Sequence, residues 1–132
     1  MTTPDTQSTV TLIIEDDPDI QLLIETILSM DPHFTPANVT ESAEEALESA
    51  RTRDPILIVL DHGLAGALTG LDAAPQLKAM APRAKIVLFT ARTELMAAAD
   101  QEPAIDAFLL KTDSTQLLAM ARRLTGTSGP PT

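Results

Sequence analysis

The sequence contains no cysteine, tryptophan or tyrosine, and only three phenylalanines among its 132 residues. The absence of cysteine excludes disulfides, thiol catalysis and thiolate zinc sites, and it is compatible with a reducing cytosol. Basic residues are also scarce, with 9 Lys and Arg against 19 Asp and Glu, and they form no basic run. The net charge of −10 disfavours contact with nucleic-acid phosphates. We therefore expect no direct nucleic-acid binding.

Long hydrophobic runs are absent as well. The apolar run at residues 56–60 is far too short to span a bilayer, so we expect no membrane insertion. The polar N-terminus lacks the basic start of a secretory signal, which favours a soluble cytoplasmic protein. The length suits one folded domain, expected over residues 9–125, with flexible tails at residues 1–8 and 126–132.

Apolar runs rich in β-branched residues alternate with amphipathic helical patterns along the chain. The expected strands span residues 9–14, 34–40, 56–60, 85–89 and 104–110. The expected helices begin near Asp17, Ser42, Asp72, Glu94, and Asp113 or Ser114. Pro36 interrupts the second strand, which should be short or lie at an edge. The alternation predicts an α/β fold with a doubly wound, five-stranded parallel sheet.

Polar side chains follow four of the expected strands. They are Glu15, Asp16 and Asp17 after the first strand, Asp61 after the third, Thr90 after the fourth, and Lys111 after the fifth. Because the carboxyl ends of parallel strands lie along one edge, these side chains should converge in one crevice. Clustered carboxylates repel one another, and Mg²⁺ with oxygen ligands is the cation that suits them. The crevice is therefore a candidate site for a divalent cation and a phosphoryl group.

The sequence resembles the CheY-like response regulator receiver domains over roughly residues 9–125. The matching motifs are Ile13-Ile14-Glu15-Asp16-Asp17, Val59-Leu60-Asp61, Leu88-Phe89-Thr90-Ala91 and Leu109-Leu110-Lys111. This resemblance implies a (βα)5 flavodoxin-like fold with strand order 2-1-3-4-5. It also implies that Asp61 is the phosphoacceptor and that Thr90 and Lys111 contact the phosphoryl oxygens. Its implied ligands for Mg²⁺ are Glu15, Asp16, Asp61 and the backbone carbonyl of Gly63.

The resemblance also implies partners and a switch. The phosphoryl donor would be a histidine kinase or a histidine phosphotransfer protein, and the downstream target is a protein that the sequence does not identify. Such a domain catalyses only its own phosphorylation and dephosphorylation, so we expect no enzyme in the usual sense. Thr90 and Phe108 occupy the family's switch positions, and the face of the fourth helix, last strand and last helix would respond. A buried core aromatic is an equally good interpretation of Phe108.

Other interpretations compete with these roles. Haloacid-dehalogenase-type phosphatases gather the same residue types, but they need an acid two residues after the nucleophile, where this chain has Gly63. A docking module that is never phosphorylated is a third possibility, and the intact Asp61, Thr90 and Lys111 argue against it. Glu15 and Asp16 could form a solvated turn. Asp17, directly before Pro18, is best explained as a helix N-cap.

The chain departs from the family pattern after Asp61 and after Lys111. Ala65 stands where the family usually has proline, and Gly70 comes one residue later than the family glycine. Thr69 replaces the acid that usually precedes that glycine, and Thr112 replaces the proline that usually follows the lysine. The loop after Asp61 is therefore one residue longer than usual.

Overall fold

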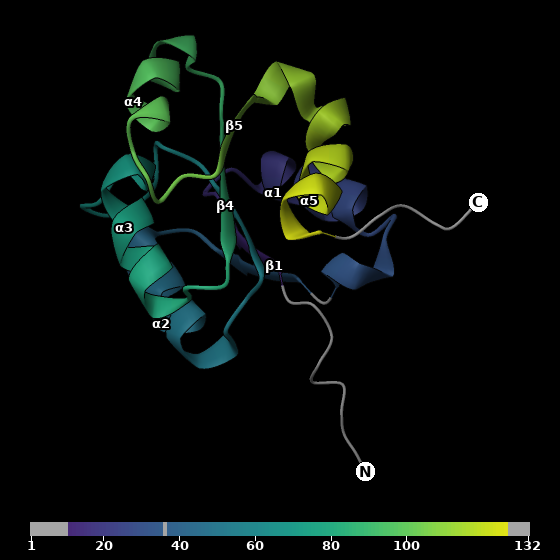
Figure 1. The fold of residues 1–132 in the computed structure, drawn as a ribbon, viewed down its shortest axis with the longest axis horizontal. Helices are drawn as coiled ribbons and strands as arrows, with labels where there is room; N and C mark the ends of the chain where they lie inside the picture. The colour runs from purple at the N-terminus through teal and green to yellow at the C-terminus, as the bar shows by residue number, and fades with distance from the viewer. Residues whose placement is uncertain (1–10, 36, 127–132) are drawn as a thin grey trace.

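The fold is a parallel sheet covered by helices, described for residues 11–35 and 37–126 in a computed structural model (Figure 1). The strands are β1 (Thr11–Ile14), β2 (Ala37–Thr40), β3 (Leu57–Leu60), β4 (Lys85–Thr90) and β5 (Ala107–Leu110). All neighbouring strands pair in parallel, in the order β2-β1-β3-β4-β5. Both the doubly wound sheet and the 2-1-3-4-5 order are confirmed.

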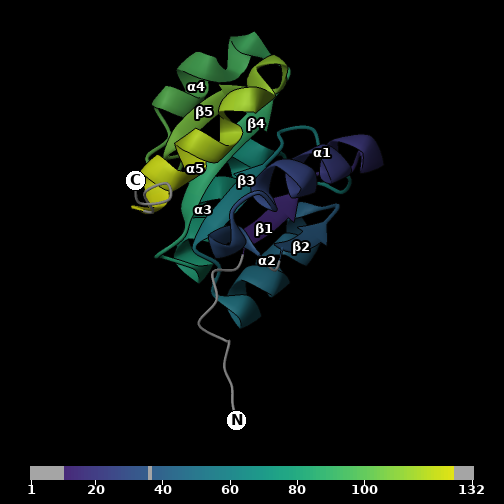
Figure 2. The same ribbon diagram turned by 90° about the vertical axis from the view of Figure 1, so that its right-hand side faces the viewer.

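Helices lie on both faces of this sheet. They are α1 (Pro18–Leu28), α2 (Ala43–Arg53), α3 (Gly70–Met80), α4 (Met96–Asp100) and α5 (Leu117–Thr125). The described part of the chain also forms three 3₁₀ segments, η2 (Pro32–Phe34), η3 (Thr93–Leu95) and η4 (Lys111–Gln116). The helices α1 and α5 cover one face, while α2, α3 and α4 cover the other (Figures 1 and 2). None of the described helices has the length and apolar character that crossing a bilayer requires.

The central strands are apolar on both sides because each side supports a separate core. Along β1, Ile13 packs into the core under α1 and α5, whereas Leu12 and Ile14 pack into the core under α2 and α3. All four residues of β3 are buried in the same alternating way. This double burial explains the continuous apolar runs, which are typical of parallel strands between two helix layers.

Two helix starts agree with the sequence prediction. The Asp17 side chain accepts a hydrogen bond from the backbone N–H of Asp19 (2.9 Å), and Pro18 is the first helical residue. At α2, the Ser42 hydroxyl accepts from the N–H of Glu45 (3.2 Å). These caps satisfy N–H groups that the first turn leaves without intrahelical partners.

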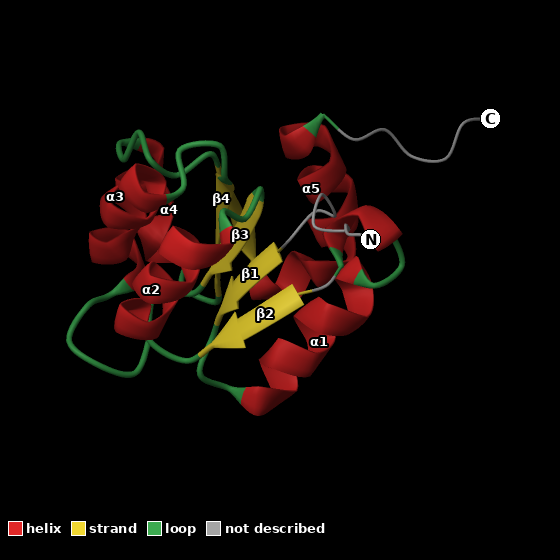
Figure 3. Ribbon diagram, turned by 90° about the horizontal axis from the view of Figure 1, so that it is seen from below, coloured by secondary structure: helices red, strands yellow, loops and turns green. Residues whose placement is uncertain are grey.

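The second strand begins later than predicted. Phe34 belongs to η2 rather than to β2, because Asp31 and Pro32 start a 3₁₀ turn in which the Asp31 side chain accepts from the N–H of His33 (3.0 Å). The strand proper starts at Ala37 and lies at the edge of the sheet, as expected (Figure 3). The tail predictions, and the first two residues of the first expected strand, fall outside the described residues except at Gly126.

Further boundaries differ from the sequence prediction. The fourth helix begins at Met96 rather than Glu94, which lies in η3. The last helix is not capped by Asp113 or Ser114, because residues after β5 first wind as the 3₁₀ segment η4 and α5 begins only at Leu117. Likewise β5 begins at Ala107 rather than Ala104. The third helix starts at Gly70, where Thr69 caps the N–H of Asp72. Pro75 therefore lies beyond the first helical turn.

Candidate functional site

Three carboxylates converge at the carboxyl edge of β1 and β3. Glu15, Asp16 and Asp61 each offer an oxygen, and these oxygens all lie within 4.8 Å of one another. The sheet fixes two of them: the N–H of Asp61 donates to the carbonyl of Ile14, and the N–H of Glu15 donates to that of Thr40, both at 3.0 Å. Because hard oxygen donors are the ligands that Mg²⁺ prefers, this group fits a divalent cation.

Burial distinguishes the three acids. Glu15 is 1% exposed and Asp61 is 8% exposed, whereas Asp16 is open to solvent. A solvated turn therefore does not describe Glu15. Its Oε2 accepts a hydrogen bond from the N–H of Asp17 (3.1 Å), and the Gln21 side chain donates to its backbone carbonyl (2.6 Å).

The ammonium of Lys111 neutralises part of the negative charge of the buried carboxylates. Its Nζ lies 2.9 Å from Oε1 of Glu15 and 3.3 Å from Oδ2 of Asp61. Burial raises the pKa of Glu15 above its usual value, although the nearby ammonium opposes this. Burial alone would lower the pKa of Lys111, but contact with Glu15 and the charge of Asp61 raise it. The lysine is therefore held charged between the two acids.

Thr90 occupies the carboxyl end of β4 and is 2% exposed. Its Oγ1 accepts a hydrogen bond from the N–H of Arg92 (3.2 Å). Within the described residues no hydrogen bond joins Thr90 to Asp61 or Lys111. The sheet thus brings Thr90 to the same edge as the acids, and its hydroxyl is held by its own loop.

The loop after Asp61 reveals a requirement that the sequence analysis missed. A Cβ atom on Gly70 would lie 2.1 Å from the carbonyl oxygen of Asp61, so only glycine fits at the start of α3. The N–H of Gly70 also donates to the carbonyl of His62 (2.9 Å). The signal in the sequence was a glycine directly after the capping residue Thr69. The loop itself makes a parallel bridge between Ala65 and Ser42.

The remaining predicted residues are not among the three converging carboxylates. Asp17 caps α1, as predicted, and is not among the three acids whose oxygens converge. Gly63 is exposed, and a Cβ there would touch nothing within 4 Å. Phe108 is half-buried: it packs against the core under α4 and also lines a groove between α4 and β5. Phe108 is therefore not a fully buried core aromatic, and its role as a switch residue stays a prediction.

Comparisons with known proteins identify the family of this chain. Residues 11–122 match the model of the response regulator receiver domain. The nitrate/nitrite response regulator protein NarL of Escherichia coli is 30% identical over 79 residues, which cover 60% of this chain and 36% of that protein. The chain therefore matches only about a third of the length of that relative.

Solved structures show the same fold. The receiver domain of NtrX from Brucella abortus has a TM-score of 0.78 and 28% identity, covering 89% of this chain and 99% of that one. The response regulator protein TrrA from Thermotoga maritima, in complex with Mg²⁺ and BeF, has a TM-score of 0.77 and 25% identity, covering 88% and 98%. With the family match over most of its length, the chain belongs to the receiver domains of two-component response regulators.

Proposed function

We propose that this domain, expected over residues 9–125, accepts a phosphoryl group on Asp61. The observation that carries the proposal is the position of the Asp61 carboxylate between two other acids and the Lys111 ammonium. A cation held by the acids on one side and the Lys111 ammonium on the other would neutralise the charge that Asp61 meets when it approaches a negatively charged phosphoryl group.

Each residue has a role in this proposal. A carboxylate oxygen of Asp61 forms a bond to phosphorus while the bond from phosphorus to a histidine nitrogen of the donor breaks. Mg²⁺, held by Glu15, Asp16, Asp61 and the Gly63 carbonyl, would neutralise charge on the phosphoryl oxygens. Lys111 exchanges its contact with Asp61 for one with a phosphoryl oxygen. The Thr90 hydroxyl donates a hydrogen bond to another.

The proposed partners follow from the family. The donor is a histidine kinase or a histidine phosphotransfer protein, and the domain acts on no substrate beyond its own aspartyl phosphate. Support for the metal comes from TrrA, a relative that was crystallised with Mg²⁺ and BeF. The acquired phosphoryl group would reshape the face of α4, β5 and α5, through Thr90 and Phe108, for a downstream protein.

Intact-mass measurement tests the proposal. The chain is incubated with acetyl phosphate, with Mg²⁺ in one sample and with a chelator in the other. We expect the mass to increase by one phosphoryl group only with Mg²⁺, and Asp61→Asn to show no increase. Asp72→Asn is the matched control, since Asp72 is an exposed acid in the first turn of α3. Labelling of Asp61→Asn at the level of this control would disprove the assignment.

A further inference from the structure

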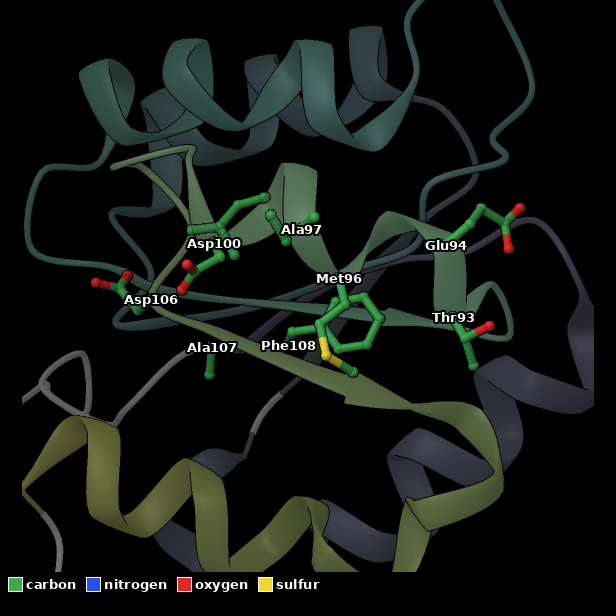
Figure 4. Close-up of a pocket in the computed structure, with 10 residues that line it drawn as sticks. Thr93, Glu94, Met96, Ala97, Asp100, Asp106, Ala107 and Phe108 are labelled. Carbon is green, nitrogen blue, oxygen red and sulfur yellow. The ribbon is translucent and has the colours of Figure 1, made fainter.

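A groove lies between α4 and β5, away from the carboxylate group. Its volume is about 670 Å³, and its lining comes from η3, α4, β5 and the segment that leads into β5. The residues that matter for its chemistry are Glu94, Met96, Asp100, Asp106 and Phe108 (Figure 4). Its size is in the range of pockets that bind ligands in proteins.

The middle of this groove is apolar. Figure 4 shows Met96 and Phe108 between Glu94 toward one end and the two aspartates toward the other. Met96 is 51% exposed, and it is one of four large hydrophobic side chains that are exposed among the described residues. An exposed methionine beside a half-buried aromatic ring suits the insertion of an aliphatic side chain.

Carboxylates lie at both ends of the groove, and none of the ten lining residues is basic. Asp106 is already neutralised, because its Oδ2 accepts hydrogen bonds from Lys78 Nζ and from the N–H of Ile86. Glu94 and Asp100 have no side-chain hydrogen bond or ion pair with any residue that the structure describes. Two uncompensated negative charges therefore flank the apolar centre.

We propose that this groove binds a partner segment that carries an apolar side chain between basic residues, as on one face of a cationic amphipathic helix. Charge complementarity selects this occupant. A second copy of the chain is disfavoured, because two molecules of net charge −10 would repel. A strongly acidic segment would meet the uncompensated carboxylates of Glu94 and Asp100.

The groove is connected to the phosphoacceptor edge through β4 and β5. Phe108 pairs with Leu88, and Leu110 pairs with Thr90, so the groove aromatic is two residues along β5 from the partner of Thr90. The regulation of binding by phosphorylation rests on the function proposed above. The recognition of a cationic segment does not, because it needs only Met96, Phe108 and the two unpaired acids.

The test uses the full chain and a synthetic probe. The probe is a fluorescent helical peptide with leucines on one face and lysines and arginines flanking them. A peptide of the same composition in scrambled order keeps the charge and removes the apolar face. Fluorescence anisotropy gives the affinities with and without beryllofluoride, and backbone chemical shifts locate the bound peptide.

Two double variants distinguish binding of the peptide in the groove from its nonspecific attraction to an acidic protein. We expect Glu94→Gln with Asp100→Asn to weaken binding about tenfold at low salt, since two ion pairs are lost. The control, Glu25→Gln with Asp72→Asn, removes the same charge from exposed positions on α1 and α3 and should change affinity by less than about twofold. Met96→Ala should also weaken binding, because it removes the apolar contact.

Several results would overturn the proposal. Equal binding of the scrambled peptide, equal weakening by the control variant, or no binding of either peptide would each contradict recognition by the groove. Dimerisation of the chain through the residues of the groove would identify a second copy as the occupant. Intact-mass labelling of Asp61 is measured on the same samples, so failure of the proposed phosphorylation is distinguished from failure of the groove to bind.

Discussion

The ammonium of Lys111 lies 2.9 Å from the buried Oε1 of Glu15, closer than it lies to the carboxylate of Asp61. Lys111 therefore acts first as the counterion of an acid that has almost no access to water. An unpaired carboxylate in such surroundings is costly, because its charge is poorly solvated. This relationship makes the stability of the fold depend on whichever cation lies in the crevice.

Replacement of Lys111 by methionine should expose this dependence. We expect Lys111→Met to lower the free energy of unfolding by about 1–3 kcal/mol in the presence of a chelator, because the buried Glu15 carboxylate loses its partner. Millimolar Mg²⁺ should restore part of the loss, because a cation that binds only the folded state stabilises it by mass action. Thermal unfolding with and without metal measures both effects. Lys85→Met, at the other end of the sheet, is the control and should respond little to Mg²⁺.

Asp16 and Asp17 are adjacent acids with different surroundings. Asp16 belongs to the converging carboxylates, whereas the Asp17 side chain caps α1. We expect Asp16→Ala to lose Mg²⁺ affinity and Asp17→Ala to keep it while losing about 1 kcal/mol of stability. Calorimetric titration with Mg²⁺ and thermal unfolding of both variants provide the measurements. An equal loss of metal affinity in the two proteins would contradict this division of roles.

The sequence was informative wherever one local rule determined the outcome. Apolar runs between two helix layers identified the strands, and the polar residues directly after those runs identified the site edge. The sequence was less informative where contacts between distant parts of the chain determine the local structure. The close approach of Gly70 to the Asp61 carbonyl depends on how α3 packs onto the sheet, and the partner of Asp31 is Arg122, 91 residues away.

Two predicted element boundaries were also wrong. The residue type of Phe34 predicts the start of a strand. In the structure Phe34 is the last residue of the 3₁₀ turn that begins at Pro32, and its side chain is fully buried. The residue type of Asp113 predicts a helix N-cap, yet Asp113 lies inside η4, and α5 begins only at Leu117. In both places a short 3₁₀ segment precedes the regular element. Asp31 followed by Pro32 was a helix-start pattern that the sequence analysis did not use, whereas nothing in the sequence separates η4 from the start of α5.

Gly70 and Gly63 flank the same loop and should differ sharply in their tolerance of alanine. In Gly70→Ala the new methyl group meets the Asp61 carbonyl, so α3 or the end of β3 must shift. We expect a loss of about 1–3 kcal/mol in unfolding free energy and slower phosphorylation of Asp61. Gly63→Ala meets open space and should retain the parent stability. Chemical denaturation and phosphorylation rates of both variants test this, and equal behaviour would refute the packing argument.

Acid stability should depend on Asp31, which is 5% exposed. Burial alone would raise its pKa, but hydrogen bonds from the His33 N–H and from Arg122 lower the pKa from 3.8 to about 2. Because the folded pKa lies below the unfolded one, the carboxylate stabilises the fold above pH 3.8, by about 2 kcal/mol. That contribution is lost as the pH falls through about 2.

Denaturation of the parent protein and Asp31→Asn at several pH values measures this contribution. The difference in unfolding free energy between the two proteins should be largest above pH 4 and should shrink toward pH 2. Asp54→Asn is the control, because Asp54 pairs with Arg83 on the exposed surface and should contribute little at any pH. A difference between parent and Asp31→Asn that stays constant over this range would contradict the assigned linkage.

Substitutions of Thr90 and Phe108 should separate the phosphorylation of Asp61 from its effect on the face of α4, β5 and α5. In the structure the Thr90 hydroxyl accepts from the N–H of Arg92, so an interaction with a phosphoryl oxygen would be new to the phosphorylated state. A population shift needs such a state-specific interaction. We therefore expect Thr90→Ala to accept phosphate on Asp61 but to respond weakly, whereas Thr90→Ser should respond like the parent. Phe108→Ala should leave phosphorylation nearly intact and uncouple the groove. Backbone chemical shifts with and without beryllofluoride provide the measurement, and full-sized changes around residues 94–110 in Thr90→Ala would show that the signal takes another route.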